Sequence, residues 1–204
     1  IQGMGLIVGA WWAYHVLGWG GYWGWDPVEN VALLPWLMST ALLHSLMVQE
    51  KRGMLKVWNL GLVVAAFGLS IFGTFVVRSG ILTSVHSFAT SSVGPYFFVF
   101  LGIVLMAALG LIAVRLPELT AEHAIDSVAS RESAFLLNNL LLVAIVAVVF
   151  WGTIFPIVSE TIRGTKIAVG PQYYRQVVGP LLLALLALMG VGPLLGWRRT
   201  SGSR

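Results

Sequence analysis

Long apolar runs separated by short polar stretches dominate the chain. Each run is about as long as the roughly 17 to 25 residues that an α-helix needs to cross the hydrocarbon core of a bilayer. Because a backbone in lipid must pair its own polar groups, we expect each run to be a helix. The pattern predicts an all-α, polytopic transmembrane bundle of about six membrane helices, at residues 1–17, 27–48, 57–78, 94–115, 133–155 and 177–196.

The composition agrees with this pattern. Of the 204 residues, 58% are hydrophobic and 10% are charged, whereas about a quarter of the residues of a soluble globular domain are charged. The absence of cysteine excludes a disulfide, a thiolate metal site and a thiol nucleophile within this sequence. The sequence starts inside an apolar run, without an initiator Met or a signal-peptide layout. We therefore interpret residues 1–204 as an internal part of one integral membrane domain.

Lys and Arg are distributed unequally between the two sides of the predicted bundle. Eight of them lie in segments 49–56, 115–132 and 197–204, and four lie on the other side. The positive-inside rule places the first set in the cytoplasm. The outer loops are then residues 18–30, 79–93 and 157–176, which in a bacterial inner membrane face the periplasm. This scattered charge indicates membrane orientation among lipids and no nucleic-acid partner.

One of the polar interruptions, residues 19–30, has the unusual sequence WGGYWGWDPVEN. Trp19, Trp23 and Trp25 lie among glycines and not on helix ends, so the interfacial aromatic belt explains them poorly. Glycine lets the backbone turn freely and leaves ring faces uncovered. Flat, exposed indoles suit a large, flat, apolar ligand with a polar edge, as a porphyrin is.

The acidic residues at the end of this stretch are explained by a helix start. Asp26 is expected at the N-cap, with Pro27 and Glu29 as the first and third helical residues. In such a capping box the aspartate accepts from the amide of the third residue, and Glu29 accepts from the amide of Asp26. The cap explains the two acids better than general acid–base catalysis does, and it anchors the aromatic stretch to the helix.

The four histidines are candidate iron ligands, because imidazole is the commonest neutral ligand. His44 lies in the inner half of a predicted membrane helix, where an ionisable side chain indicates either a functional site or a hydrogen bond to a neighbouring helix. His86 lies in a Ser/Thr-rich outer loop, either solvated or ligating beside the aromatic stretch. His15 is interpreted as an interfacial residue, and His123 as an exposed loop residue.

Arg78 is a positive charge at the outer end of a predicted helix, against the orientation bias. Two interpretations remain open for it. Its guanidinium either pairs with a carboxylate of a ligand, such as a haem propionate, or reaches toward the membrane interface as long basic side chains do.

Several segments in order resemble the haem-handling proteins of cytochrome c maturation. The tryptophan-rich stretch resembles their "WWD" signature, which the CcsA and CcmC branches share. The series of segments from residue 26 onward resembles the CcmF/NrfE branch, and the resemblance covers about residues 9–197. The segments that carry it are DPVEN at 26–30, LHSL at 43–46, GTFVVRSG at 73–80, TSVHSFA at 83–89 and an outer segment from FPI at 155–157 to KIAVGP at 166–171.

This resemblance implies an integral membrane haem lyase. Such proteins take haem from the periplasmic chaperone CcmE and attach it to Cys-x-x-Cys-His motifs of apocytochrome c, together with maturation subunits of the CcmH/CcmI type. His86 matches the family's axial ligand of the handled haem, and His44 matches a ligand of a structural transmembrane haem b. The partner histidine of each would lie outside this sequence. Trp19, Trp23, Trp25, Asp26 and Arg78 are the further candidates for contact with haem.

The mechanism that the resemblance suggests is positional. The aromatic stretch would hold one face and edge of the ring while two cysteine thiols add to the vinyl groups, and no enzyme thiol takes part. Two alternatives remain open: a conduit that carries haem across the membrane with His44 as a way-station, and a non-catalytic platform on which chaperone and apocytochrome dock. A sensor or structural protein with an aromatic belt would leave Arg78 and His86 unexplained.

Overall fold

The computed structural model describes residues 1–18, 21–84, 91–119, 127 and 130–196, with the backbone alone at residue 17. The described residues form helices and no strand, which confirms the all-α prediction. The elements are α1 (Gln2–Trp12), the π-helix η1 (Ala13–Leu17), α2 (Pro27–Arg52), α3 (Lys56–Ser79), α4 (Gly94–Arg115), the 3-10 helix η2 (Leu116–Leu119), α5 (Arg131–Arg163), α6 (Pro171–Val191) and the 3-10 helix η3 (Gly192–Leu194).

Five of these helices are long and apolar enough to cross a membrane: α2, α3, α4, α5 and α6. This confirms the prediction of a polytopic helical bundle. The run expected at residues 1–17 consists of α1 and η1, and α1 has 11 residues, fewer than a bilayer crossing needs.

The outer loop expected at 157–176 is shorter than the sequence indicated. Helix α5 continues over 33 residues to Arg163 and tolerates Pro156 inside it. It ends where Gly164 adopts a left-handed conformation with φ of 68°, which glycine adopts without steric cost. Helix α6 then begins at Pro171, a favourable first helical residue, so the loop comprises residues 164–170.

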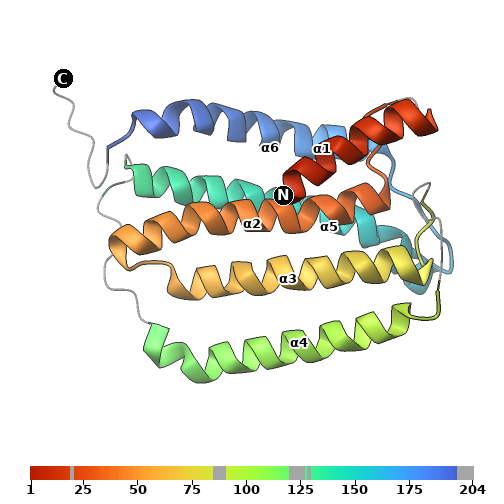
Figure 1. Ribbon diagram of the computed structural model, residues 1–204, viewed down its shortest axis with the longest axis horizontal. Coiled ribbons are helices and arrows are strands. Elements are labelled where there is room, and N and C mark those ends of the chain that lie inside the picture. Colours follow the sequence, from red (N-terminus) through yellow and green to blue (C-terminus); the bar gives the residue numbers. More distant parts are fainter. Residues whose placement is uncertain (19–20, 85–90, 120–126, 128–129, 197–204) are drawn as a thin grey trace.

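The membrane-spanning helices lie side by side along the length of the molecule in the order α4, α3, α2, α5, α6, and neighbours run antiparallel (Figure 1). Helix α1 is short, packs on α2 and leans away from the bundle axis near the end where α2 begins (Figure 1). We call that end, on the right of Figure 1, the outer end, after the orientation predicted from the loops, and the opposite end the inner end.

The main core lies between α2, α3, α5 and α6. Leu34, Ala41, Ile145 and Val149 are among its buried members. Most of the side chains of α4 and α6 face outward and are apolar. Such surfaces suit lipid or further membrane helices.

Polar pairs join α2 to α5 at three levels of this apolar core. Asn30 donates to Thr153 near the outer end, His44 contacts Asn138 further in, and Arg52 pairs with Glu132 at the inner end. Since an unpaired polar group in an apolar interior is unfavourable, these pairs fix the register of α2 against α5. They also place His44 on the α5 side of α2.

Candidate functional site

The aromatic stretch is attached to α2 by the predicted capping box. The amide of Val28 donates to Asp26 Oδ1 at 2.9 Å, and Glu29 Oε2 accepts from the amides of Asp26 at 3.0 Å and Gly24 at 2.9 Å. The cap prediction is confirmed. The extra bond from Gly24 means that Glu29 holds the chain between the last two tryptophans as well as the helix start.

Trp25 packs into the protein and does not present two open ring faces. Its backbone has a positive φ of 58°, which turns the indole inward, and the ring stacks on Tyr174 of α6 at 4.9 Å with planes 4° apart. Asn30 donates to the carbonyl of Trp25 at 3.2 Å and so holds this turn. The expectation of uncovered ring faces is wrong for Trp25, because one face is covered by a tyrosine from a helix far along the sequence.

Trp23 is half-buried and lies edge-on to Trp25, with ring centroids 5.9 Å apart. It lines a cavity of about 220 Å³ between α1 and α2, together with Trp12 and Glu29. Its indole Nε1 is buried and finds no acceptor among the described residues. A buried donor without a partner is unfavourable, so this N–H suits an acceptor brought by a ligand. Trp19 lies outside the described residues.

An exposed group of rings at the junction of η1 and the aromatic stretch was not predicted. Tyr22 stacks on Tyr14 at 4.4 Å, and His15 lies 4.6 Å from the ring of Trp11 and 5.1 Å from that of Tyr14. We call Trp11, Tyr14, His15 and Tyr22 the outer aromatic cluster. The sequence could have indicated this cluster, because aromatic residues lie both before and after Gly18. Gly18 has a left-handed φ of 63° and turns the chain back on itself.

The described residues on both sides of segment 85–90 are tied to the outer end. Ser84 donates to Asp26 Oδ1 at 2.5 Å, and the amide of Ser91 donates to the carbonyl of Arg78 at 2.9 Å. Lys166, in the loop between α5 and α6, donates to the carbonyl of Ile81 at 2.7 Å. His86 itself lies outside the described residues, but the residue two positions before it is bonded to the cap residue of the aromatic stretch.

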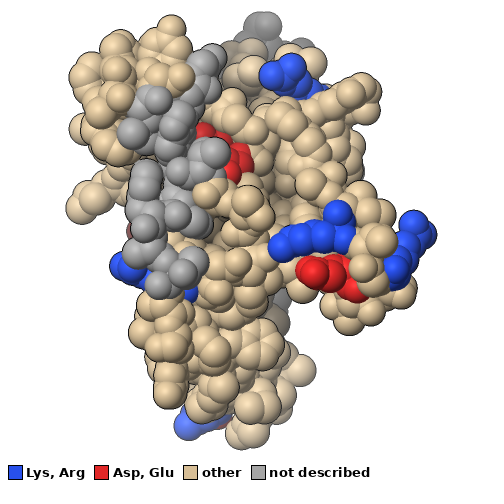
Figure 2. Space-filling model, turned by 90° about the vertical axis from the view of Figure 1, so that its right-hand side faces the viewer, with Lys and Arg blue, Asp and Glu red and all other residues tan. Residues whose placement is uncertain are grey.

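Arg78 is exposed in the last turn of α3. It lines a cavity of about 390 Å³ with Gln2, Ser70 and Thr74, and not the cavity lined by Trp23. The surface at the outer end carries few charged side chains (Figure 2). Arg78 and Trp23 therefore line two different cavities at the outer end.

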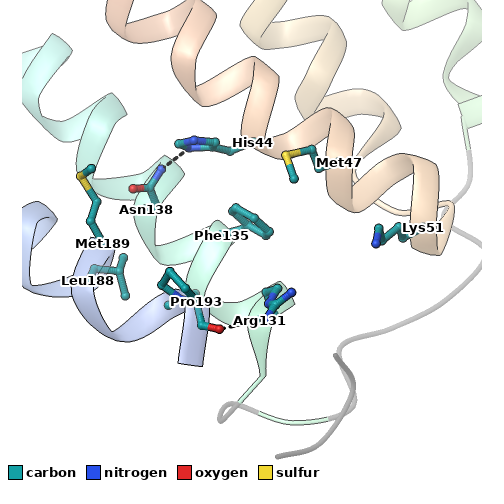
Figure 3. A pocket seen from close by; sticks show the side chains of 11 residues that line it. His44, Met47, Lys51, Arg131, Phe135, Asn138, Leu188, Met189 and Pro193 are labelled. Atoms are coloured by element: carbon teal, nitrogen blue, oxygen red, sulfur yellow. Dashed lines mark hydrogen bonds between the residues drawn. The ribbon is translucent and has the colours of Figure 1, made fainter. Parts of the chain in front are cut away.

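A second candidate site surrounds His44. A cavity of about 440 Å³ lies between α2, α5 and the end of α6, and the half-buried imidazole is on its wall (Figure 3). Phe135 lies 5.6 Å from the imidazole, ring centroid to ring centroid. Asn138 Nδ2 lies 2.6 Å from His44 Nδ1. The remaining walls are mostly apolar, with residues such as Met47, Leu188, Met189 and Pro193.

Two cations complete the lining of this cavity at its inner end, Lys51 from α2 and Arg131 from α5. Arg131 also donates to the carbonyls of Pro193 and Leu195, at 2.9 and 3.1 Å, and so joins the start of α5 to the end of η3 (Figure 3). The cavity thus has an imidazole in its apolar part and positive charge toward the inner surface.

The chemistry of these donors suits a haem better than a bare metal ion. A metal held by side chains alone needs three or four ligands, and the described residues contain no group of three His, Cys, Asp or Glu that could supply them. The macrocycle of a haem supplies four nitrogens to its iron, so one or two axial histidines suffice. His123 lies outside the described residues, and His15 is in the outer aromatic cluster.

Comparisons with known proteins agree with the resemblance noted in the sequence. Residues 2–83 match the family described as Cytochrome C assembly protein. The chain is 47% identical over 199 residues to the cytochrome c-type biogenesis protein CcmF of Pseudomonas aeruginosa, covering 97% of this chain and 30% of that protein. It is 43% identical over 197 residues to CcmF of Escherichia coli, covering 96% of this chain and 30% of that protein.

A solved structure of a protein titled Cytochrome c Heme Lyase CcmF superposes with a TM-score of 0.76 at 39% sequence identity, covering all of this chain and 29% of that one. The chain thus spans about 30% of the length of the relatives it matches. Together with the helical bundle, these similarities show that the chain belongs to the CcmF-type family of cytochrome c biogenesis proteins, multi-pass membrane proteins of bacteria.

Proposed function

We propose that this protein handles haem during cytochrome c maturation, as part of a haem lyase in the bacterial inner membrane. The observation that carries the proposal is the cavity at His44, where one imidazole faces an apolar space flanked by two cations. A structural haem b fits this arrangement. The outer end contributes a second site, for the haem that is to be attached.

The cavity at His44, which we call the inner cavity, has three features that a haem needs. Its volume of about 440 Å³ lies within the range of ligand sites, and its walls are largely apolar. His44, on the wall of the cavity, would supply a nitrogen ligand to the iron. Lys51 and Arg131 bring positive charge to the end where propionates would lie, and charge-assisted contacts between guanidinium and carboxylate are among the strong hydrogen bonds. When bound, such a haem would supply one-electron redox chemistry at this position.

At the outer end, the proposal rests on the connection between the aromatic stretch and the segment that carries His86. The hydrogen bond from Ser84 to Asp26 ties the last described residue before that segment to the cap residue that follows Trp23 and Trp25 in the sequence. His86 would then ligate the iron of the substrate haem while Trp19 and Trp23 contact the ring. Trp25, stacked on Tyr174, would hold the aromatic stretch in place beside this haem.

The reaction proposed for the substrate haem is thioether formation. Two cysteine thiols of a Cys-x-x-Cys-His motif in apocytochrome c add across the two vinyl groups, and each thiol hydrogen goes to the vinyl carbon that does not bond sulfur. This chain, which contains no cysteine, holds and orients the reactants, and such positioning lowers the barrier by removing the entropy of encounter. The proposed partners are the haem chaperone CcmE, apocytochrome c and maturation subunits of the CcmH/CcmI type.

A conduit for haem through the described residues has less support. Between the level of His44 and the outer end, the α2–α5 interface is filled by buried side chains that include Leu34, Ala41, Ile145 and Val149. A close-packed interior of this kind leaves no passage for a macrocycle. A non-catalytic docking platform would use the outer end but would not need the His44 cavity.

The test uses the full-length protein, purified from bacterial membranes. We expect His44→Ala to remove the absorbance of haem b, and His86→Ala to abolish cytochrome c formation while that absorbance stays. His15→Ala is the matched control, an exposed histidine at the outer end of the molecule with no assigned ligand role. Normal maturation in both His44→Ala and His86→Ala would overturn the proposal.

A second measurement separates ligation from transport. Haem is supplied only to the periplasmic side of spheroplasts that cannot make their own, and thioether-linked cytochrome c is assayed by haem stain after denaturation. Continued ligation is expected if the outer site receives its haem there. Ligation that depends on cytoplasmic haem would favour the conduit.

A further inference from the structure

A short polar contact in the cavity at His44 joins two helices. Asn138 Nδ2 of α5 lies 2.6 Å from His44 Nδ1 of α2, and Asn138 is only 6% exposed (Figure 3). A buried amide in an apolar interior is unfavourable unless it is hydrogen-bonded. The side chain of Asn138 is therefore satisfied, at least in part, by the imidazole of His44, a residue that lines the cavity.

This contact has two chemically distinct forms. If the amide N–H donates to Nδ1, the imidazole hydrogen is on Nε2, and Nε2 has no lone pair for a metal. If the amide is turned by half a rotation, its oxygen accepts from Nδ1–H and leaves the lone pair of Nε2 free. The two orientations of an asparagine amide have nearly the same shape, so the same residue accommodates both tautomers of His44.

A second group on α5 restrains the same ring. Phe135 lies one turn before Asn138, and its ring is 5.6 Å from the imidazole with an interplanar angle of 35°. Phe135 packs beside the ring, and Asn138 fixes its Nδ1 edge. The rotation of the imidazole about its Cβ–Cγ bond is therefore set by residues of α5, although His44 belongs to α2.

We propose that Asn138 is a positioning residue for the inner site: its amide oxygen accepts the hydrogen of Nδ1 and so directs Nε2 of His44, in the tautomer that binds metal, toward the iron of the haem. The inference rests on the haem site of the proposed function and adds the residue that orients its ligand. A hydrogen-bond acceptor on the far nitrogen of a ligating histidine raises the basicity of that ligand. A more basic axial ligand favours ferric iron, so Asn138 also lowers the reduction potential of the haem.

The test compares Asn138→Leu, Asn138→Asp and Asn138→Gln in the full-length protein. Haem affinity is measured by titrating haem into purified apoprotein, and the midpoint potential by spectroelectrochemistry. Loss of the hydrogen-bond partner of a ligating histidine typically weakens metal binding about 10- to 100-fold. We expect Asn138→Leu to weaken haem binding by a factor in that range and to make the midpoint potential of the haem more positive. Asn138→Asp places a stronger acceptor on Nδ1 and should make the potential more negative. Asn138→Gln keeps the amide and should restore most of the affinity.

Asn59→Leu is the matched control. Asn59 is also a buried asparagine, 4% exposed, and its amide donates to Gln49 of α2 at the same distance of 2.6 Å, outside the cavity lining. If Asn138→Leu changes affinity and potential no more than Asn59→Leu does, the inference is wrong. It is also wrong if Leu, Asp and Gln all weaken binding equally, since that result indicates packing and not hydrogen bonding.

The failure of the proposed function has a different signature. If the wild-type protein carries a haem b that His44→Ala leaves unchanged, His44 is not its ligand and the inner site itself is misassigned. If His44→Ala removes the haem but the variants of Asn138 behave as the control does, the site stands and the positioning role falls.

Discussion

Trp25 shows how one residue connects the aromatic stretch to the bundle. Its indole lies flat on Tyr174, and Tyr174 in turn packs over Gly152 of α5, where an added Cβ would come within 2.8 Å of the tyrosine hydroxyl. A stacked aromatic pair stabilises a protein by about 0.5–1.5 kcal/mol in addition to the free energy gained by burying its apolar surface. The position of the last tryptophan therefore depends on the absence of a side chain at residue 152.

The consequence is testable with Gly152→Ala. The new methyl group has no room unless Tyr174 moves, and overpacking of this kind costs about 1–3 kcal/mol. We expect a lower melting temperature in detergent and a change in tryptophan fluorescence. Gly61→Ala is the control, because a Cβ there meets no atom within 4 Å. An unchanged melting temperature in Gly152→Ala would show that the Trp25–Tyr174 stack adapts freely.

At the scale of elements, α2 carries both ends of the proposed function. Its N-terminus holds the aromatic stretch through Asp26 and Glu29, and its inner half carries His44. The cap was predictable from sequence because it depends only on residues next to one another in the chain. The partners of α2 were not predictable: Asn138 was visible as a polar residue in another helix, but its pairing with His44 depends on the register of α2 against α5.

The capping box gives a graded prediction. Asp26→Ala removes the acceptor for Val28 and for Ser84, and loss of an N-cap costs about 0.5–2 kcal/mol. Asp26→Asn keeps an acceptor oxygen, and asparagine caps helices about as well as aspartate. We expect cytochrome c maturation to fall clearly in the alanine variant and only slightly in the asparagine variant, as measured by haem-stained cytochrome c per cell. Equal losses in both would indicate that the negative charge matters more than the cap.

A buried ion pair joins α2 to α5 at the inner end. Arg52 Nε lies 3.5 Å from Glu132 Oε1, and both side chains are less than a tenth exposed. Removing one partner of such a pair leaves a buried charge and costs about 3–5 kcal/mol, whereas replacing both by apolar residues is often nearly neutral. We expect Arg52→Met and Glu132→Leu each to lower the melting temperature strongly, and the double variant to recover most of the loss. Additive losses in the double variant would contradict this.

At the scale of the whole molecule, the distribution of apolar residues was sufficient to predict where along the sequence the long membrane-spanning helices lie. It could not reveal which faces are buried, because nearly every position in α4 and α6 is apolar whether it meets protein or not. It also made the predicted loop between α5 and α6 too long, since Pro156 suggests a helix end although a membrane helix tolerates proline. The contact from Lys166 to Ile81 gives that loop a role at the outer end that its sequence did not indicate.

The orientation of the bundle remains a prediction from the unequal distribution of Lys and Arg, and the sequence offers a direct way to test it. Because these residues include no cysteine, single cysteines can be introduced into a cysteine-free background of the full-length protein. Gly21 at the outer end and Glu50 at the inner end are both exposed, and a side chain added at residue 21 meets no atom within 4 Å. A membrane-impermeant maleimide applied to spheroplasts should label Gly21→Cys, while Glu50→Cys should react only after the membrane is permeabilised. The reverse pattern would place the aromatic stretch in the cytoplasm, out of reach of a periplasmic chaperone and of apocytochrome c, and the lyase proposal would fail with it.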